Sequence, residues 1–445
     1  MGSDRPAFAF SAKAGRTTTT PINFLIDVAL KDPDLISLAA GLVDQESLPA
    51  AEVRDLVGAL MDDETAGKAA LQYGTTHGMG ELREAIAEHV CRLDGVAPPD
   101  IGVGPANVMV ASGSQQLLYI VTDILVDPGD IVITEWPSYF VYTGALVSFG
   151  ASVRAVEMDE HGMRLDRLAE TLEDLKRRGE LGRVKIVYVC DYYQNPTGIT
   201  LAAERRAELL EIVRSYSTDH RICILEDAAY RELACEGTPP PSIKSHESDN
   251  AQVVLAQTFS KPFAPGFRCG YAILPDDLIE PALNQKGNHD FGSGNLSQYV
   301  LLRAMRTGMY AEHVETLRRR YRAKRDAMLK ALAEHLGDFE PPQTTWTRPG
   351  GGLYVWLTLP AWMDTGRDGD LFAAAVDEGV VYVPGEFCFG PDPRRAAERN
   401  HMRLTFGTVD EAAIREGVGR LARAIRRVAG SGRSADGGKT TAEPS

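Results

Sequence analysis

The stretch NVMVASGSQQLLYIVTDIL, residues 107–125, decides the fold class of this chain. Its first part, 107–111, is an apolar run of the kind that forms a short buried strand. The small residues 112–114 allow a tight turn, and the remainder through Leu125 has a helical pattern. A buried strand that passes through a turn into a helix is typical of α/β proteins.

Similar signals recur on the carboxyl side of this stretch. Four more apolar runs, separated mostly by helical patterns or long connections, lie at 130–133, 185–190, 222–225 and 253–256. On the amino side, the apolar spacing over 80–93 predicts a helix with one buried face. Continuous apolar strands alternating with helices indicate a mainly parallel sheet covered on both faces. We therefore expect an α/β fold with a large domain over residues 71–308.

The flanking regions predict a second, smaller unit. A long charged helix is predicted at 310–335, followed by strands at 353–357, 380–383 and 402–406 and a helix at 409–428. This pattern predicts an α+β domain over 309–429, shared with an N-terminal segment at 21–70. Residues 1–20 are expected to form a flexible arm. Residues 430–445 are expected to be a disordered tail, because they carry too little apolar surface to become ordered.

Composition narrows the function classes. The 445 residues carry a net charge of −15, which repels phosphate backbones and argues against nucleic acid as a partner. No apolar run approaches the roughly 20 residues of a membrane span, and no signal segment is expected. The six cysteines are scattered without a C-x-x-C pair, so we expect no disulfide framework and no metal site. A cytoplasmic enzyme or binding protein is the expected class.

The turn Gly113-Ser114-Gln115 is the first candidate for chemistry. Small residues let the backbone approach a ligand, and the N-terminus of the following helix offers free N–H groups and a positive dipole end. The turn therefore suits a phosphate group, although an ordinary strand-to-helix turn has the same sequence signature.

Thr258-Phe259-Ser260-Lys261, followed by Arg268, is the second candidate. A lysine at the carboxyl end of a strand points into the crevice where α/β sheets bind ligands. Withdrawn from water and placed near a cation, it becomes a Schiff-base nucleophile. A hydroxyl group and the guanidinium of Arg268 would hold a phosphate. The alternative is a solvated surface lysine.

Three further residues follow strands or lie in one. Asp227 could hold a protonated ring nitrogen or cap a helix, and Tyr230 could donate to a ring oxygen. Asn195, in an Asn-Pro-Thr-Gly turn, could bind a ring oxygen or a carboxylate. Arg403 in a late apolar strand requires an anionic partner, and a carboxylate suits it best. Phosphate, ring nitrogen, ring oxygen, aldehyde and substrate carboxylate are together the needs of pyridoxal phosphate.

At this point the order of motifs resembles the class I/II aminotransferases, a family of fold-type-I enzymes that depend on pyridoxal phosphate. The resemblance spans about residues 24–427. It is most similar to the kynurenine and α-aminoadipate aminotransferase branch, through the opening Leu38–Leu42 and the Ser-Gln-Gln turn. The motifs that carry it are Tyr73-Gly74, Ser112–Gln116, Pro137-Ser138-Tyr139, Asn195–Gly198, Asp227-x-x-Tyr230, Ser260-Lys261 with Arg268, Pro349–Gly352 and Arg403.

The resemblance implies a role for each residue. It implies that Lys261 is the catalytic residue, which holds the cofactor as an imine and later moves the substrate proton. Cofactor-binding roles fall to Gly113, Ser114, Gln115, Tyr139, Asn195, Asp227, Tyr230, Thr258, Ser260, Lys261, Arg268 and Tyr73. Substrate-binding roles fall to Gly41, Asn195, Arg403 and Tyr354.

The resemblance also implies partners and a fold. The partners are an amino acid, a 2-oxo acid and a second copy of the chain, because Tyr73 reaches the neighbouring subunit's cofactor in this family. The implied fold is that of the fold-type-I transferases, in which the small domain closes over substrate.

Two places depart from the family pattern. Thr258 stands where serine is common, which keeps the hydroxyl group. The region around Trp136 and the stretch 289–295 follow no branch closely, and the latter lies where the family takes substrate contacts from the partner subunit. The side-chain pocket is expected to involve Tyr354, Phe291, Leu42 and Tyr142; the alternative is that these aromatic and aliphatic residues belong to the core.

The main functional hypothesis is amino-group transfer from an L-amino acid to a 2-oxo acid. One alternative keeps the cofactor but performs β-elimination, as a C–S lyase, or a decarboxylating or oxidative deamination. A remote alternative is a catalytically inactive ligand-sensing module, as found in regulators that fuse this fold to a basic DNA-binding domain.

Overall fold

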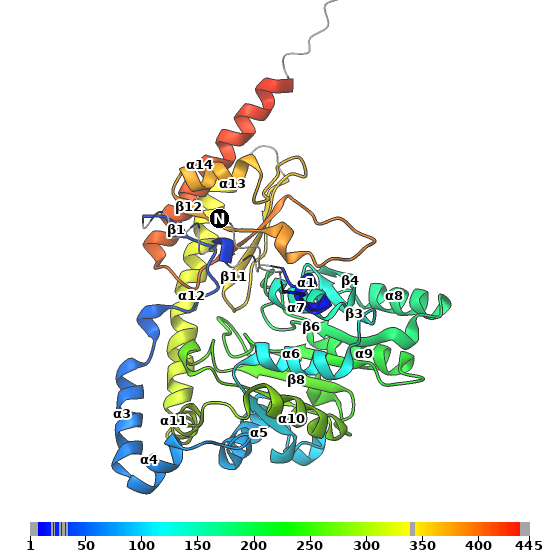
Figure 1. The fold of residues 1–445 in the computed structure, drawn as a ribbon. Helices are drawn as coiled ribbons and strands as arrows, with labels where there is room; N and C mark the ends of the chain where they lie inside the picture. Colours follow the sequence, from blue (N-terminus) through cyan, green and yellow to red (C-terminus); the bar gives the residue numbers. More distant parts are fainter. Residues whose placement is uncertain are drawn as a thin grey trace, which may run out of the picture.

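A mixed, mostly parallel sheet forms the centre of the larger body (Figure 1). The computed structural model describes residues 8–18, 21, 23–25, 28, 32, 34–338 and 343–436. Within these residues the sheet has eight strands in the order β2-β9-β8-β7-β6-β3-β4-β5. Their bounds are β2 Val108–Ala111, β3 Ile131–Trp136, β4 Ser152–Asp159, β5 Gly162–Met163, β6 Val184–Val189, β7 Cys223–Asp227, β8 Val253–Thr258 and β9 Gly270–Ile273.

The strand directions confirm the predicted mainly parallel sheet. Strands β8, β7, β6, β3 and β4 run parallel to one another. Strand β9, which the sequence did not predict, is antiparallel to both β8 and β2. The connection 259–269 between β8 and β9 is too short for a crossover helix, so the chain must turn back. This connection contains both Lys261 and Arg268.

Helices cover both faces of this sheet, as expected for an α/β fold. In β6, Val187 and Val189 pack in one hydrophobic cluster, whereas Ile186 and Tyr188 pack in the other. The first cluster is covered by α8 (Leu165–Arg177) and α9 (Ala203–Tyr216). Helices on the second cluster are α5 (Gly80–Asp94), α6 (Ser114–Leu125), α7 (Phe140–Phe149) and α10 (Asp276–Asp290).

The C-terminal part forms a smaller α+β unit. The long helix α12 (Met309–Leu336) leads into it. A four-stranded antiparallel sheet follows in the order β10 (Thr345–Trp346), β11 (Tyr354–Thr358), β14 (His401–Thr405) and β13 (Val383–Pro384). Helices α13 (Asp370–Asp377) and α14 (Glu411–Asp436) pack together beside α12.

The N-terminal segment joins this smaller unit through a short sheet. Strand β1 (Ile36–Ser37) pairs in parallel with β12 (Val380–Val381). The predicted single strand at 380–383 is therefore wrong: the chain is divided at Tyr382, with β12 paired to β1 and β13 paired to β14. Helix α14 extends beyond the predicted end at 428, and residues 437–445 of the predicted tail lie outside the described residues.

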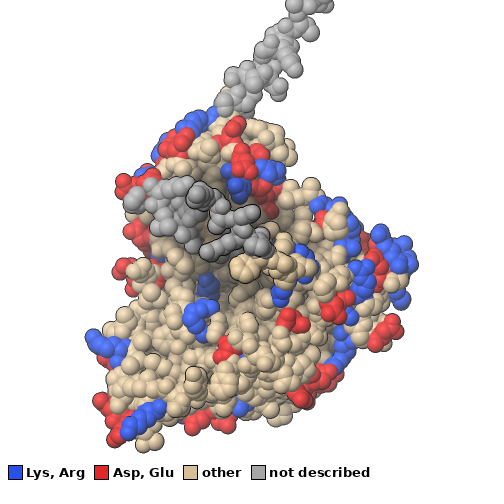
Figure 2. Space-filling model, in the orientation of Figure 1, with Lys and Arg blue, Asp and Glu red and all other residues tan. Residues whose placement is uncertain are grey.

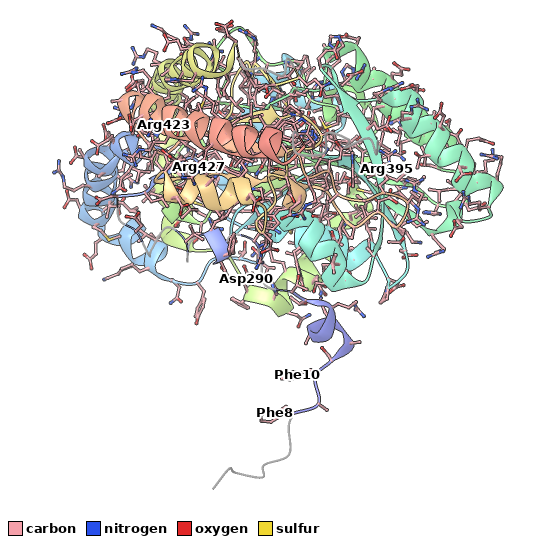
Figure 3. The ribbon with its side chains drawn as sticks, turned by 90° about the horizontal axis from the view of Figure 1, so that it is seen from above. Phe8, Phe10, Asp290, Arg395, Arg423 and Arg427 are labelled. Carbon is pink, nitrogen blue, oxygen red and sulfur yellow. The ribbon has the colours of Figure 1, made fainter. Side chains whose placement is uncertain are left out.

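The predicted arm contains a short helix, α1 (Ala12–Arg16), that contacts α7. Arg16 Nε donates to the Ser148 carbonyl oxygen at 3.2 Å, and the Thr17 and Ser148 hydroxyl groups lie 2.8 Å apart. Before α1 the chain extends away from the body and exposes Phe8 and Phe10 (Figure 3). Residues 1–7, 19 and 20 of the predicted arm lie outside the described residues.

The lower left of the molecule in Figure 1 is formed by α3 (Ala50–Asp62), α4 (Glu64–Leu71) and α11 (Asn295–Arg306). On the face in Figure 2, basic and acidic side chains are interspersed around the rim, and the lower part is mostly uncharged. Within the described parts of the chain, every helix is too short or too polar to span a membrane.

Candidate active site

Two adjoining cavities lie where the carboxyl ends of β6, β7 and β8 meet the smaller unit. The first has a volume of about 190 Å³ and the second about 480 Å³. Both are lined by Tyr139, Asn195, Tyr230 and Lys261. The smaller is also lined by Gly113, Ser114, Gln115, Cys190, Asp227, Ala229, Thr258, Ser260, Pro265 and Arg268. The larger adds Leu25, Ser37, Ala39, Ala40, Gly41, Leu42, Phe140, Tyr354, Arg403 and Thr408.

One end of the smaller cavity is a cationic cradle at the N-terminus of α6. Gly113 has a φ of +90°, and a Cβ atom there would lie 3.0 Å from Arg268 Nη2. Arg268 Nη2 donates to the Ser112 carbonyl oxygen at 2.9 Å. Opposite, the Ser260 backbone N–H donates to the Thr258 hydroxyl at 3.0 Å. Free helix N–H groups, hydroxyl groups and a guanidinium are the donors that bind a phosphate dianion.

Asp227 ends β7 at the other end of the smaller cavity. The Tyr188 hydroxyl donates to Asp227 Oδ2 at 2.9 Å, and Asp227 Oδ1 is buried without a partner among the described residues. Burial raises the pKa of Asp227 to about 6, against a smaller lowering by the bonds from Tyr188 and the Ala229 backbone. A carboxylate oxygen with no donor in a polar cavity is suited to a cationic N–H group.

Lys261 lies between the two cavities. Its Nζ donates to the Gly41 carbonyl oxygen at 2.8 Å. Withdrawal from water lowers the pKa of Lys261 and outweighs the raising effect of Tyr354, while Arg403 and Arg268 lower the pKa further. A lowered lysine pKa increases the share of the neutral, nucleophilic amine.

Arg403 on β14 is the cation of the larger cavity. Its Nη1 donates to Asn195 Oδ1 at 2.8 Å and its Nη2 to the Ala39 carbonyl oxygen at 2.7 Å. Its Nε is buried without a partner among the described residues. The guanidinium carbon lies 4.3 Å from the centre of the Tyr354 ring, on which the group stacks. A guanidinium held by neutral acceptors, with a donor left over, is suited to a carboxylate.

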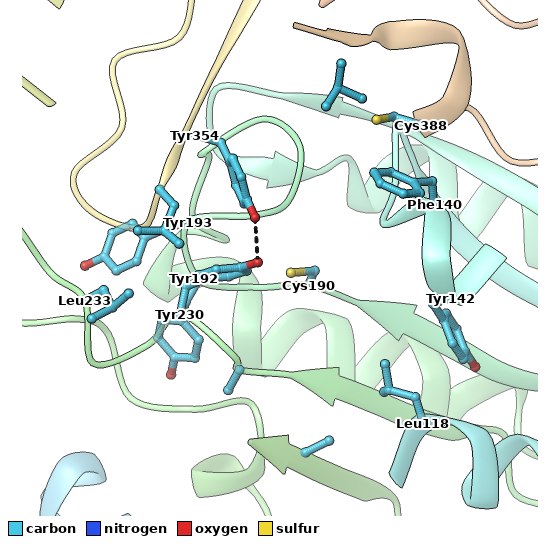
Figure 4. Packing of buried hydrophobic residues seen from close by; sticks show 14 of the residues in the cluster. Leu118, Phe140, Tyr142, Cys190, Tyr192, Tyr193, Tyr230, Leu233, Tyr354 and Cys388 are labelled. Atoms are coloured by element: carbon cyan, nitrogen blue, oxygen red, sulfur yellow. Dashed lines mark hydrogen bonds between the residues drawn. The ribbon is translucent and has the colours of Figure 1, made fainter. Parts of the chain in front are cut away.

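A tyrosine pair connects the two bodies of the protein at the cavities. Tyr354 comes from β11 of the smaller unit and Tyr230 from the chain after β7, and their hydroxyl oxygens are 3.2 Å apart (Figure 4). Burial raises the pKa of Tyr230 well above its ordinary value, so its hydroxyl remains a neutral donor. Cys190 lines the smaller cavity together with Tyr230, and Phe140 lines the larger cavity together with both tyrosines.

The smaller cavity therefore fits a phosphorylated pyridine aldehyde. Its contents are a phosphate cradle, an unpartnered carboxylate oxygen for a ring nitrogen, hydroxyl and amide groups for a ring oxygen, and an amine. Gln115 Oε1 is a further buried acceptor without a partner among the described residues. Within the same residues, no three His, Cys, Asp or Glu side chains gather as ligands for a metal.

The structure brings together most of the residues predicted from the sequence, except Tyr73, Phe291 and Tyr142, which line neither cavity. Tyr73 is 82% exposed and its ring lies 5.6 Å from that of Phe291, outside the lining of both cavities. The prediction that Tyr142 lines the pocket is wrong, because Tyr142 is fully buried and packs on Tyr188. Leu42 and Tyr354 do line the larger cavity.

The lining or supporting residues that sequence reasoning missed include Leu25, Phe140, Tyr188 and Cys190. Tyr188 lies in β6 and Cys190 directly follows it, within an apolar run that has the sequence signature of a core strand. The alternation of side chains along the run 185–190 was the available signal. It places Tyr188 and Cys190 on one face of the sheet, and Tyr188 contacts Asp227 there.

Comparisons with known proteins agree with this site. The family model described as aminotransferase class I and II matches residues 33–421. The chain is 36% identical over 417 residues to the aromatic-amino-acid aminotransferase 1 of Thermococcus litoralis, and the match covers 94% of each chain.

Two solved structures are also similar. The kynurenine aminotransferase of Pyrococcus horikoshii, in complex with PMP, has a TM-score of 0.84 at 33% identity and matches over 94% of this chain and 97% of its own. The α-aminoadipate aminotransferase of Thermus thermophilus, complexed with N-(5′-phosphopyridoxyl)-L-leucine, has a TM-score of 0.81 at 31% identity, with 95% and 98% covered.

The fold and the matches define a fold-type-I transferase, as predicted. This chain belongs to the class I and II aminotransferases. It is an enzyme of amino-group transfer that depends on pyridoxal phosphate, and its resemblance to the kynurenine and aminoadipate branch is confirmed.

Proposed function

We propose that the chain transfers the amino group of an L-amino acid to a 2-oxo acid, with Lys261 as the residue that binds the cofactor and carries the proton. The observation that carries this proposal is the position of Lys261, whose amine faces both cavities. An amine at this boundary reaches the cofactor on one side and the substrate Cα on the other.

The smaller cavity supplies the cofactor contacts in this proposal. Pyridoxal phosphate, when bound, supplies an electron sink that stabilises negative charge at the substrate Cα. The α6 N-terminus, Ser260 and Arg268 would hold its phosphate. Asp227 would keep the ring nitrogen protonated through its free Oδ1. Asn195 and Tyr230 would bind the ring oxygen, and Tyr139 would lie against the ring.

The larger cavity supplies the substrate contacts. Arg403 would exchange its present acceptors for the substrate α-carboxylate, with Asn195 beside it. The apolar wall formed by Leu25, Leu42 and Phe140 supports an amino acid with an aromatic or aliphatic side chain. The names of the relatives, which include an aromatic-amino-acid and a kynurenine aminotransferase, point in the same direction.

We also propose that the enzyme works as a homodimer in the cytoplasm. Exposed Tyr73 and Phe291 pack edge to face at the surface, which supports their use by a partner subunit. All six cysteines are free, which suits a reducing compartment.

Strand β1 of the N-terminal segment pairs with β12 of the C-terminal part. Segments 21–70 and 309–429 would therefore move together and close over substrate on the body 71–308.

A product assay tests the reaction type. Transamination predicts that an amino acid such as L-phenylalanine yields its 2-oxo acid once per site, and continuously only when a second 2-oxo acid is supplied. Release of pyruvate from a cysteine conjugate, or of carbon dioxide, without need of a second 2-oxo acid would support the lyase or decarboxylating alternative. The Lys261→Ala variant should lose turnover in every assay, whereas a fully active variant would refute the role of Lys261.

A further inference from the structure

The loop 191–201, called here the Asn195 loop, carries the one amide side chain that lines both cavities. The loop connects β6 to α9 and belongs to no strand or helix. Its ends are joined by the Leu201 N–H, which donates to the Asp191 carbonyl oxygen at 2.9 Å. Inside the loop the Gln194 N–H donates to the Ile199 carbonyl oxygen at 2.8 Å, and Arg403 Nη1 donates to Asn195 Oδ1 at 2.8 Å. Two side chains attach the loop to the rest of the protein in addition.

At the neck of the loop, Arg206 of α9 contacts both ends. Its Nη2 donates to the carbonyl oxygens of Asp191 and Leu201, each at 3.1 Å, and its Nε donates to Leu201 at 3.2 Å. Its Nη1 is paired with the Asp191 carboxylate. The Arg206 side chain is fully buried, and it stacks on the Tyr192 ring at 4.3 Å. One guanidinium fork therefore closes the neck.

At the tip of the loop, Gln194 makes a second attachment. Its Nε2 donates to Glu135 Oε2 at 2.7 Å and to the Pro137 carbonyl oxygen at 3.1 Å. Its Oε1 accepts from the Thr197 hydroxyl at 2.5 Å. Gln194 and Thr197 stand on either side of Asn195, so this amide connects the tip of the loop to the end of β3.

Neither side chain lines a cavity, and both are fully buried. A buried guanidinium is expensive to desolvate, and the donors of Arg206 are all satisfied, at Asp191 and Leu201. Arg206 also comes from α9, which packs on the face of the sheet opposite α6. Arg206 and Gln194 therefore touch neither cavity, and their influence on the reaction passes through the loop.

We propose that Arg206 and Gln194 are positioning residues, which fix the Asn195 side chain between the smaller cavity and Arg403. This inference rests on the proposed function. Replacing Arg206 by Lys keeps the charge near Asp191 and removes the fork that joins Asp191 to Leu201. Replacing Gln194 by Met keeps the length of the side chain and removes the hydrogen bonds of its amide to Glu135, Pro137 and Thr197.

The expected result is a ten- to hundredfold loss of kcat/KM in Arg206→Lys and in Gln194→Met, about the cost of a small misplacement of a contact group. In the same two variants the dissociation constant for pyridoxal phosphate should rise. In protein without cofactor, the amides of residues 192–200 should exchange with deuterium faster than in wild type. This last measurement does not depend on the enzyme being active.

Arg205→Lys is the matched control. Arg205 is the neighbouring residue of α9, and it pairs with Asp159 at 2.7 Å at the partly exposed side of the helix. The control should leave kcat/KM, cofactor affinity and exchange in the loop within about twofold of wild type.

The decisive step combines each variant with Asn195→Ala. If the two residues act through Asn195, Arg206→Lys and Gln194→Met change cofactor affinity by less than about twofold in the Asn195→Ala background. Equal losses in both backgrounds, or unchanged exchange in the loop, would overturn the proposal. If Arg206→Lys does not fold, Gln194→Met decides the question. An inactive wild type would refute the proposed function instead, with the exchange and affinity results still standing.

Discussion

The Asp227 carboxylate is placed to bind a ligand, and in the protein without that ligand its burial lowers stability. It is 3% exposed, has one oxygen without a partner and has a pKa of about 6. In the unfolded chain an aspartate titrates near 3.9. Between these two pH values the folded form binds more protons, so the contribution of Asp227 to stability is lost as pH rises through about 6.

This imbalance predicts the behaviour of Asp227→Asn. Because asparagine does not ionise, the variant without cofactor should melt at a higher temperature than wild type at about pH 7.5, and the gap should narrow as pH falls toward 5. With cofactor, kcat should fall on the order of 10² to 10³-fold. Thermal melts across this pH range, with and without pyridoxal phosphate, measure both effects. A cofactor-free variant less stable than wild type at pH 7.5 would contradict the argument.

Single residues also show the reach of sequence reasoning. Lys261, Asp227 and Asn195 could be found because each lies at the end of a strand or after it, and strand ends meet at one edge of a parallel sheet. Tyr188 could not be found in this way, since its hydroxyl bond to Asp227 depends on which strands are neighbours. Tyr142 was misplaced for a different reason: an aromatic side chain suits the core and a pocket equally well.

Among the secondary-structure elements, the turn into α6 is the one most sensitive to substitution. Gly113 combines a φ of +90° with a close approach to Arg268. A Cβ atom would strain the backbone by about 1–3 kcal/mol and displace the guanidinium. Gly113→Ala should therefore raise the dissociation constant for pyridoxal phosphate about ten- to hundredfold.

Gly95→Ala controls for backbone strain away from the cradle. Gly95 caps α5 with a φ of +69° and has open space around its Cβ position. It should lower the melting temperature without changing cofactor affinity. Equal cofactor affinities of Gly113→Ala and wild type, measured by equilibrium dialysis, would remove the cradle from the account.

The elements differ in how well the sequence predicts them. Helix α5 and the long α12 were predicted closely, because their periodic patterns persist over several turns. Strand β9 was missed because a short connection and an antiparallel course leave no helix as a signal. The run 380–383 is continuous in sequence, and only the partners β1 and β14 divide it.

For the whole molecule, the proposed homodimer predicts complementation between two defective chains. Lys261→Ala lacks the amine, and Tyr73→Ala lacks the exposed ring proposed to serve the partner's site. In a hybrid dimer, one site would combine Lys261 of one subunit with Tyr73 of the other. Randomly mixed dimers should therefore recover about a quarter of wild-type activity.

The complementation requires subunit exchange, so the two chains should be unfolded and refolded together or produced together. Lys261→Ala mixed with wild type is the control, since its activity should fall only in proportion to the inactive sites. Mixtures of the two variants with no more activity than the variants alone would contradict a site shared between subunits.

The amine of Lys261 is proposed to hold the cofactor, and borohydride reduction followed by peptide mass mapping tests this central role most directly. With pyridoxal phosphate bound, reduction should add one phosphopyridoxyl group per chain, on Lys261 alone, and none to Lys261→Ala. A chain that gains no adduct, or carries it on another lysine, would contradict the central claim.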